Sequence, residues 1–267
     1  MSAVQPPVPR TIGAVNWRGL WELYLKEVRR FVKVYLQTIG APLVTTLLFL
    51  SIFALALGRA VQTQGGVPFM EFLAPGLMMM AMVQNAFANT SSSIIISKVQ
   101  GSIIDVLMPP ISPLELTLAY GAAGVTRGLL VGLAVGLAMS LFVTVHIHDV
   151  GMILFHAVGA SLMLSLLGML AGIWADKFDH LAAVTNFLIT PLSFLSGTFY
   201  SLDRLPENVQ FIAHFNPFFY MIDGFRYGFI GHDDALPGLS VIVVGGTNLV
   251  LAGLTYWLIR KGWKLKA

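Results

Sequence analysis

Residues that could carry catalysis are few and scattered along this chain of 267 residues. It has no cysteine, which excludes disulfides, thiolate metal sites and cysteine nucleophiles. No stretch matches GxxxxGKS or GxxxxGKT, so the chain lacks a P-loop for binding and hydrolysing ATP. Of the six histidines, only His146 and His148, beside Asp149, lie close together. Such a cluster in a loop is more often a solvated turn than a metal site, so we predict no catalytic residue, metal or cofactor.

Two groups inside apolar stretches are further candidates. Arg127 is a charge within an apolar run, which makes it a functional candidate by default. It lies near one end of that run, so we favour snorkelling or a structural ion pair over a role in transport. The run Met78, Met79, Met80 and Met82 could suggest copper, but methionines in apolar helices more often serve packing. The acidic residues that could pair with Arg127 are Asp105, Glu115, Asp176 and Asp179.

The composition indicates that lipid is the main solvent of the chain. Hydrophobic residues make up 56% of it and charged residues 11%, whereas soluble proteins carry about 25% charged residues. Residues 1–10 are polar and proline-rich, so we expect no cleavable signal peptide. A helix needs about 20 apolar residues to cross the hydrocarbon core. We predict an all-α membrane protein, a single domain over residues 1–267, with six spans at 34–58, 72–96, 114–145, 150–175, 181–202 and 236–259.

The basic residues orient these spans. An even number of spans places both termini on one side, and cytoplasmic loops carry an excess of Lys and Arg. If the termini are cytoplasmic, the opposite side carries only Arg59, Arg204 and Arg226. We therefore predict cytoplasmic termini. The cytoplasmic side then carries Arg10, Arg18, Lys26, Arg29, Arg30, Lys33, Lys98, Lys177, Arg260, Lys261, Lys264 and Lys266.

An amphipathic helix is predicted at residues 17–33, after a flexible cytoplasmic tail at 1–16. Its spacing also allows an ion pair between Glu22 and Lys26. A basic helix with tryptophans on its apolar face is typical of the membrane interface, and contact with a cytoplasmic partner is an equally good interpretation. The apolar positions are Trp17, Leu20, Trp21, Tyr24, Leu25, Val28 and Val32, and the basic ones include Lys26, Arg29 and Arg30.

The cytoplasmic loop at residues 98–108 is unusually apolar. Prolines at 109 and 110 would end a short helix there, and Ile103, Ile104 and Leu107 would form its apolar face. An apolar face in water favours docking into a groove on another protein. The alternative is an interfacial turn that rests on lipid headgroups.

The segment at residues 203–231 on the outer side is rich in aromatic residues. We predict two short helices, each opened by a proline, at 206–215 and 217–229. Helices as apolar as these, with Phe219 among their aromatics, would be insoluble in the open, so we expect them to be re-entrant in the outer leaflet. Asp223 and Arg226 have the spacing of an ion pair.

Glycines recur every four residues in two of the predicted spans. Small residues at this spacing let helix backbones approach closely in lipid, so we expect a packing role, within the chain or between subunits. They are Gly124, Gly128, Gly132 and Gly136 in the third span, and Gly168 and Gly172 in the fourth.

Several strings resemble the type-2 ATP-binding-cassette (ABC-2) exporter permeases of bacteria. The strings are FLAPGLMMM at 72–80, the loop at 98–110, PLSFLSGTFYSL at 191–202 and FNPFFYMIDGFRYG at 215–228. The group includes polysaccharide exporters (O-antigen and teichoic acid), nodulation-factor exporters and drug-efflux relatives. The resemblance covers nearly the whole chain and does not single out a substrate.

The resemblance implies a permease subunit in the bacterial inner membrane, a homodimer or a dimer with a close relative. Two copies of a cytoplasmic nucleotide-binding subunit would bind ATP and Mg²⁺, so this chain would not be an enzyme. The helix at 17–33 would also rest on that subunit. The loop at 98–108 would be the coupling helix that contacts it, although Gly101 and Ser102 stand where relatives often have a basic residue. The contact residues would be Lys98, Gly101, Ile103, Ile104, Asp105 and Leu107.

The substrate path would then lie at the dimer interface, lined by the first, second and fifth spans. Its apolar lining favours an amphipathic or lipid-linked substrate, or a drug, and nothing indicates nucleic acid. The polar candidates are Asn85, Asn89, Thr90, Thr190 and Ser193. The alternative is a membrane-embedded enzyme or a scaffold acting on lipid-linked intermediates. An enzyme would need acidic or histidine residues that converge at one membrane face, and the sequence indicates no such cluster.

Overall fold

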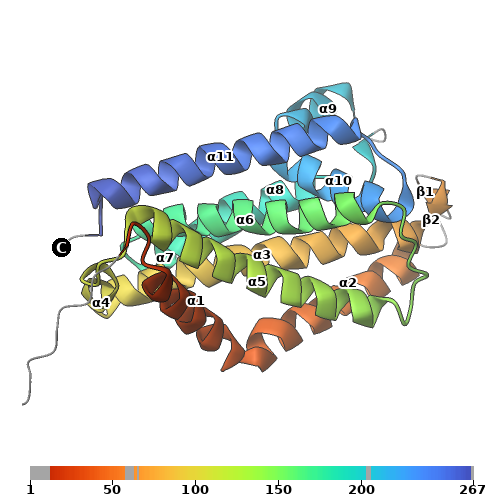
Figure 1. Ribbon diagram of the computed structural model, residues 1–267. Helices are drawn as coiled ribbons and strands as arrows, with labels where there is room; N and C mark the ends of the chain where they lie inside the picture. The colour runs from red at the N-terminus through yellow and green to blue at the C-terminus, as the bar shows by residue number, and fades with distance from the viewer. Residues whose placement is uncertain (1–12, 58–62, 65, 203–205, 266–267) are drawn as a thin grey trace, which may run out of the picture.

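The computed structural model describes residues 13–57, 63–64, 66–202 and 206–265, and this part is a bundle of long helices (Figure 1). The long helices are α2 (Ala41–Leu57), α3 (Phe69–Val99), α5 (Pro113–Met139), α6 (Val150–Trp174) and α11 (Pro237–Lys261). The shorter helices are α1 (Trp17–Val32), α4 (Ile103–Leu107), α7 (Phe178–Val184), α8 (Thr190–Leu195), α9 (Glu207–His214) and α10 (Pro217–Ile230). Two π-helical turns, η1 (Leu36–Gly40) and η2 (Thr185–Ile189), lead into α2 and join α7 to α8. Two short antiparallel strands, β1 (Thr63–Gln64) and β2 (Val67–Pro68), precede α3.

Among the described residues, five helical stretches are long and apolar enough to cross a membrane. Helix α3, which contains the predicted second span, is not one of them, because Gln84, Asn85 and Asn89 lower its mean hydropathy. Six spans were predicted, and five of them meet the criteria of length and hydropathy among the described residues. The five are Leu36–Ala56, Pro113–Met139, Val150–Trp174, Phe178–Leu195 and Pro237–Lys261.

Two predicted spans end earlier than expected. The third was predicted to reach residue 145, but α5 ends at Met139 and the chain turns there. The fifth was predicted over 181–202, but the helical stretch begins at Phe178 and ends at Leu195. Gly197 follows with a φ of 73°, a left-handed conformation that glycine adopts without steric cost and that ends the helix. Residues 1–12 of the predicted tail lie outside the described residues, as do Arg59 and Arg204.

Helix α3 is the centre of the bundle and packs mainly against α6 and α5. Glycines make this approach possible, because a Cβ built on Gly168 would lie 2.5 Å from the carbonyl oxygen of Phe87. A Cβ on Gly172 would lie 3.1 Å from the carbonyl oxygen of Ser91. The packing role predicted for the glycine series is confirmed, and it operates within one chain.

The two ends of the bundle carry different elements (Figure 1). The start of α1, α4, α7 and the end of α11 lie at one end, which we call the α4 end. Helices α9 and α10 and the two strands lie at the other, the α10 end. The sequence places the loop at 98–108 and the segment at 203–231 on opposite sides, and the fold separates them in the same way.

Candidate functional site

Helix α4 lies at the α4 end with one side on the protein and the other in the open. Gly101, with a φ of 72°, turns the chain out of α3, and the prolines after Met108 end the short helix. Val106 is buried, and Ile103 and Leu107 pack beside it against the apolar core. Ile104 is 56% exposed and Met108 77% exposed. That core includes Leu23 of α1, Tyr120 of α5, Ile173 of α6 and Leu265.

This placement divides the apolar face predicted for the loop. Ile103 and Leu107 face the chain's own core, so the face open to a partner consists of Ile104 and Met108, one turn apart. Asp105 and Gly101 are also exposed. The sequence pattern does not single out Met108, because it stands at the very end of the short helix, directly before Pro109.

Lys98 holds α3 to the end of α6. Its ammonium donates hydrogen bonds to the carbonyl oxygens of Ile173 (2.8 Å) and Ala175, and lies 3.6 Å from Asp176. A lysine at this position satisfies the free carbonyls of a helix C-terminus. The amine that was expected to contact a partner is therefore engaged within the chain.

A junction of three segments supports α4 from the other side. Glu115 and Ser112 form a capping box at the start of α5, and Glu115 also accepts the backbone N–H of Asn16 at 2.6 Å. The side-chain amide of Asn16 donates to the carbonyl oxygen of Pro110 at 3.1 Å. The start of α1, the residues after α4 and the start of α5 are thereby fixed to one another.

Helix α1 packs on α5 through a stripe that differs from the predicted apolar face. Leu23, Glu27 and Phe31 are its buried residues, whereas Trp17 and Trp21 are 72% and 54% exposed. Exposed tryptophans fit an interfacial helix. Arg29 is also exposed. The predicted pair of Glu22 and Lys26 does not form, because the ammonium of Lys26 lies 3.8 Å from Glu27 instead.

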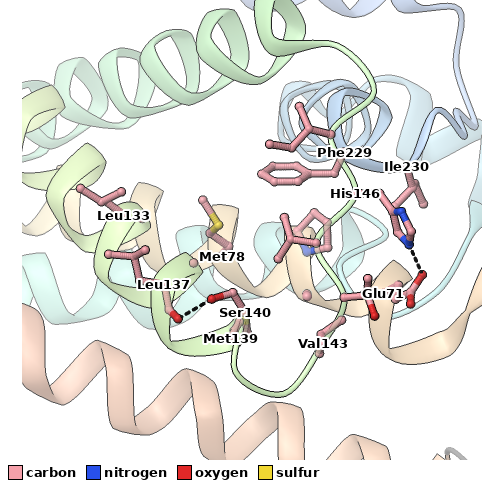
Figure 2. Close-up of a pocket in the computed structure, with 17 residues that line it drawn as sticks. Glu71, Met78, Leu133, Leu137, Met139, Ser140, Val143, His146, Phe229 and Ile230 are labelled. Carbon is pink, nitrogen blue, oxygen red and sulfur yellow. Dashed lines mark hydrogen bonds and ion pairs between the residues drawn. The ribbon is translucent and has the colours of Figure 1, made fainter.

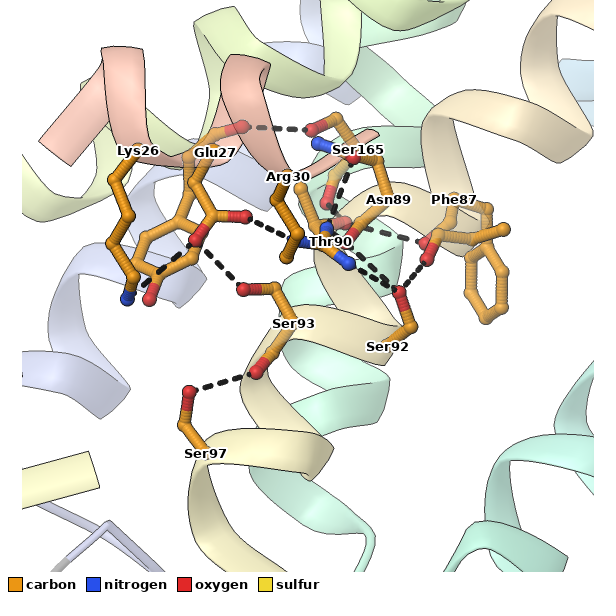
Figure 3. A network of polar contacts seen from close by, with 12 residues as sticks. Lys26, Glu27, Arg30, Phe87, Asn89, Thr90, Ser92, Ser93, Ser97 and Ser165 are labelled. Atoms are coloured by element: carbon orange, nitrogen blue, oxygen red, sulfur yellow. Dashed lines mark hydrogen bonds and ion pairs between the residues drawn. The ribbon is translucent and has the colours of Figure 1, made fainter. Parts of the chain in front are cut away.

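A polar network joins α1 to α3 (Figure 3). The carboxylate of Glu27, fully buried, pairs with Arg30 at 3.0 Å and accepts a hydrogen bond from Ser93 at 2.8 Å. Arg30 also donates to the backbone and side-chain oxygens of Asn89, at 2.6 and 3.0 Å. The buried charge of Glu27 is thus paired and hydrogen-bonded, as a stable buried charge requires.

Arg127 binds α3 one turn away from this network. Its guanidinium donates to the side-chain oxygen of Asn85 at 2.9 Å. None of the four acidic residues predicted as partners, all of which are described, forms an ion pair with it. Asn85 and Asn89, four residues apart on α3, therefore each hold an arginine from a different helix, α5 and α1.

Two cavities flank the polar side of α3, and both are lined by Gln84 and Asn85. One, of about 410 Å³, lies between α3 and the stretch from α7 to α8, and Thr190 is among its lining residues. The other, of about 270 Å³, lies between α3 and the stretch formed by η1 and α2. Further polar lining residues are Ser91, Ser92 and Thr185 of the first cavity and Gln37, Thr45 and Thr46 of the second.

Only two of the five residues predicted for a substrate path reach these cavities, Asn85 and Thr190. Thr90 donates to the carbonyl oxygen of Ser165, Ser193 donates to that of Ile189, and Asn89 accepts from Arg30. These three side chains are buried; Thr90 and Asn89 join α3 to other helices, whereas Ser193 bonds within its own helical stretch. The spacing of residues along α3 could have revealed the side that faces the larger cavity. Gln84, Ala88 and Ser92 follow one another at four-residue steps, which places them on one face of the helix, and all three are partly exposed.

Helix α10 is enclosed by α3, α6 and α11, and Phe219 is among its fully buried residues. Asp223 and Arg226 do not form the predicted ion pair. The carboxylate of Asp223 accepts the backbone N–H groups of Asp234 and Ala235, each at 3.0 Å. Arg226 lies over the ring of Phe72 at 3.8 Å and donates to the carbonyl oxygen of Gly197. Each charge thus finds its contacts in a separate part of the chain.

Comparison with known proteins agrees with the resemblance found in the sequence. A family model described as ABC-2 type transporter matches residues 18–230. The inner membrane transport permease YadH of Escherichia coli strain K12 is 36% identical over 252 residues, which cover 94% of this chain and 98% of that protein. Nodulation protein J of Rhizobium leguminosarum bv. viciae is 25% identical over 224 residues, 82% of this chain and 84% of that protein. The chain therefore belongs to the ABC-2 type transporter family, in which the permease is a transmembrane component and ATP hydrolysis takes place on a separate subunit.

Proposed function

We propose that this chain is the permease subunit of an ATP-driven exporter in a bacterial inner membrane. Two copies of a cytoplasmic nucleotide-binding subunit, which bind ATP and Mg²⁺, would drive it, and the permease would act as a homodimer. The family and the name of the E. coli relative support a transport permease of the inner membrane. Export as the direction of transport, the two ATPase copies and the homodimer are part of the proposal.

In this proposal α3 also spans the membrane, as the second span along the chain, which brings the number of spans to six. Both termini then lie in the cytoplasm. The 31 residues of α3 extend the full depth of the bundle between α5 and α6, which are long and apolar enough to span. Helices α9 and α10 are re-entrant. The burial of α10 among α3, α6 and α11 supports this, because polar backbone at membrane depth needs protein cover. Lys98, Lys177 and Lys264 at the α4 end support a cytoplasmic position for that end.

The exposed pair on α4 carries the proposal. Ile104 and Met108 remain open on a short helix whose other side, Val106, is fixed in the core. Apolar side chains in this arrangement fit a groove on a partner, with Asp105 beside them for a polar contact. Because α4 is tied to α1 and α5, a push on α4 moves whole helices rather than a loop.

The test uses the stand-alone nucleotide-binding subunit that the proposal expects to be encoded next to this chain. Ile104→Asp combined with Met108→Asp should abolish its co-purification, because two charges would enter an apolar contact. Leu114→Asp is the matched control, since Leu114 is 55% exposed at the start of α5 and lies outside α4. Normal co-purification and ATPase coupling of the double variant would show that α4 is not the contact.

The cavities on either side of α3 are proposed as part of the substrate path. They lie between the stretches Leu36–Ala56 and Phe178–Leu195, which are only 11% and 17% buried in one chain. A second copy of the chain would cover these open faces. Polar groups within a largely apolar surround suit an amphipathic or lipid-linked substrate.

Because the chain has no cysteine, a single introduced cysteine can report on this path. Ala88 lines the larger cavity, whereas Ala86, two residues away, is fully buried. Ala88→Cys should react with a maleimide at a rate that changes when the nucleotide-binding subunits bind ATP, and Ala86→Cys should stay unreactive. A rate at Ala88→Cys that does not respond to ATP would exclude this cavity from the path.

A further inference from the structure

An apolar cavity of about 330 Å³ lies near the α10 end and is separate from the proposed substrate path (Figure 2). Helices α3 and α5 form two of its walls. The turn after α5 and the last residues of α10, Phe229 and Ile230, form the others. Gly132 and Gly136 line it from α5, and a Cβ on Gly136 would lie 3.2 Å from Sδ of Met78, which also lines the cavity. Its lining also includes Ala74, Met78, Leu133, Leu137, Glu71 and His146.

The position of the cavity decides what can reach it. Leu133 and Leu137 at its edge are 59% and 64% exposed on α5, a helix long and apolar enough to cross the membrane. Their exposed faces therefore meet lipid, and the cavity is continuous with that surface. An apolar cavity has no polar partners for water and takes up apolar ligands instead.

Two polar side chains stand at one side of this apolar space. Nε2 of His146 lies 3.2 Å from Oε2 of Glu71, and both residues line the cavity. The Glu71 side chain is 13% exposed and that of His146 is 55% exposed. They lie just beyond the end of α5 and near the start of α3, at the level where the apolar part of the bundle ends. A carboxylate beside an imidazole matches a headgroup that contains both an ammonium and a phosphate.

We propose that this cavity binds one phospholipid with an amine-bearing headgroup from the leaflet at the α10 end. One acyl chain enters from the side, past Leu133 and Leu137, and fills the space beside Met78 and Ala74. The ammonium binds Glu71, and the phosphate lies at His146. The lipid joins α3, α5 and the end of α10 at the point where their protein contacts leave a gap.

A helix from a second copy or from another protein fits this cavity less well. A docked helix needs a groove that is open at both ends, whereas residues 143–147 close this cavity at the α10 end. A flexible acyl chain needs only the lateral opening. The two polar side chains at the edge, Glu71 and His146, have no role in contact with an apolar helix face, but they complement a zwitterionic headgroup.

Native mass spectrometry of the purified full chain tests the proposal. The protein is exchanged into an equimolar mixture of palmitoyl-oleoyl phosphatidylethanolamine and phosphatidylglycerol and then transferred to mild detergent. The wild type should retain one phosphatidylethanolamine per chain. Ala74→Phe and Gly136→Phe, which place a ring in the cavity from two different helices, should each weaken retention about tenfold, equivalent to about 1.4 kcal/mol.

Matched controls separate filling of the cavity from the insertion of a ring elsewhere. Ala122 on α5 and Gly246 on α11 are exposed outside the cavity, so Ala122→Phe and Gly246→Phe should retain the lipid as the wild type does. Glu71→Gln should remove the preference for phosphatidylethanolamine over phosphatidylglycerol. If one ring variant fails to fold, the other and the wild-type measurement still decide.

Three results would overturn the proposal. The wild type could retain no lipid or both lipids equally, or the two ring variants could retain lipid as well as their controls. Ring variants that change the oligomeric state and leave bound lipid unchanged would assign the cavity to a second copy of the chain. None of these results depends on ATPase binding or export, so the proposed function stands or falls separately.

Discussion

Replacing Gly168 with alanine tests the packing of α6 on α3 at its closest point. The added Cβ would lie 2.5 Å from the carbonyl oxygen of Phe87, which belongs to the helix backbone and cannot rotate away. It would also meet Oγ1 of Thr90, whose hydrogen bond to the carbonyl oxygen of Ser165 is 2.7 Å long. The two helices must therefore separate, and this hydrogen bond is strained or lost.

The size of the effect follows from these two contacts. Overpacking of a well-packed site costs about 1–3 kcal/mol, and a hydrogen bond between membrane helices contributes about 0.6 kcal/mol. Gly168→Ala should therefore destabilise the protein by about 2–4 kcal/mol. For a chain of this size about 1 kcal/mol corresponds to about 2–4 °C, so the melting temperature should fall by roughly 5–15 °C.

The control is Gly253→Ala on α11, an exposed position where a Cβ would meet nothing within 4 Å. There alanine should be neutral, or stabilising by about 0.5–1 kcal/mol through helix propensity. Both variants are compared with the wild type by thermal unfolding in the same detergent, followed by circular dichroism and by loss of monodisperse protein. If Gly168→Ala and Gly253→Ala have the same melting temperature, α3 and α6 do not approach each other at Gly168 as closely as described.

Three further substitutions test the polar contacts. Arg226→Lys should cost about 2–3 kcal/mol, because an ammonium cannot stack flat on Phe72 as a guanidinium does while it donates to the carbonyl oxygen of Gly197; a Tm equal to that of the wild type would contradict this. Glu27→Ala should cost about 1–3 kcal/mol, since it leaves the Ser93 hydroxyl on α3 and the Arg30 guanidinium on α1 without their shared acceptor. Thermal unfolding measures this loss of stability. The hydrogen bond from Lys264 lowers the pKa of Asp176, so this contact holds at neutral pH and is lost as the pH falls below the ordinary range of a carboxyl group. Asp176→Asn should therefore raise hydrogen exchange of residues 262–265 at neutral pH, while the same rise in the wild type requires acid.

Hydropathy predicted the apolar stretches, because their length is set by the membrane and not by neighbouring residues. It predicted their ends less well. The fifth span ends at Leu195 because Gly197 takes a left-handed conformation, although the apolar run continues to Leu202. The polar residues of α3 that lower its hydropathy are the ones that bind arginines and line cavities, so the same residues that obscure the helix as a span also indicate its role.

Ion pairs predicted from spacing along one helix were wrong in two cases, for different reasons. Glu22 and Lys26 are exposed, where the spacing rule gives only a few tenths of a kcal/mol. Asp223 and Arg226 are buried, and a buried charge needs several hydrogen bonds that a single neighbour cannot supply. Their partners come from other segments, which a pattern within one helix does not reveal. The burial of Glu27 could have been noticed from its position, because it lies four residues from both Leu23 and Phe31 and so shares their helix face.

The position of the two asparagines on α3 links the two halves of the proposed mechanism. Asn89 holds Arg30 of α1, and α1 is fixed to the residues after α4 through Asn16. Asn85, one turn further along, holds Arg127 and lines both cavities beside α3. A displacement of α1 or α5 at the α4 end must therefore either move α3 or break charge-assisted hydrogen bonds, which are about twice as strong as neutral ones. Moving α3 changes the width of both cavities at once, because it is their shared wall.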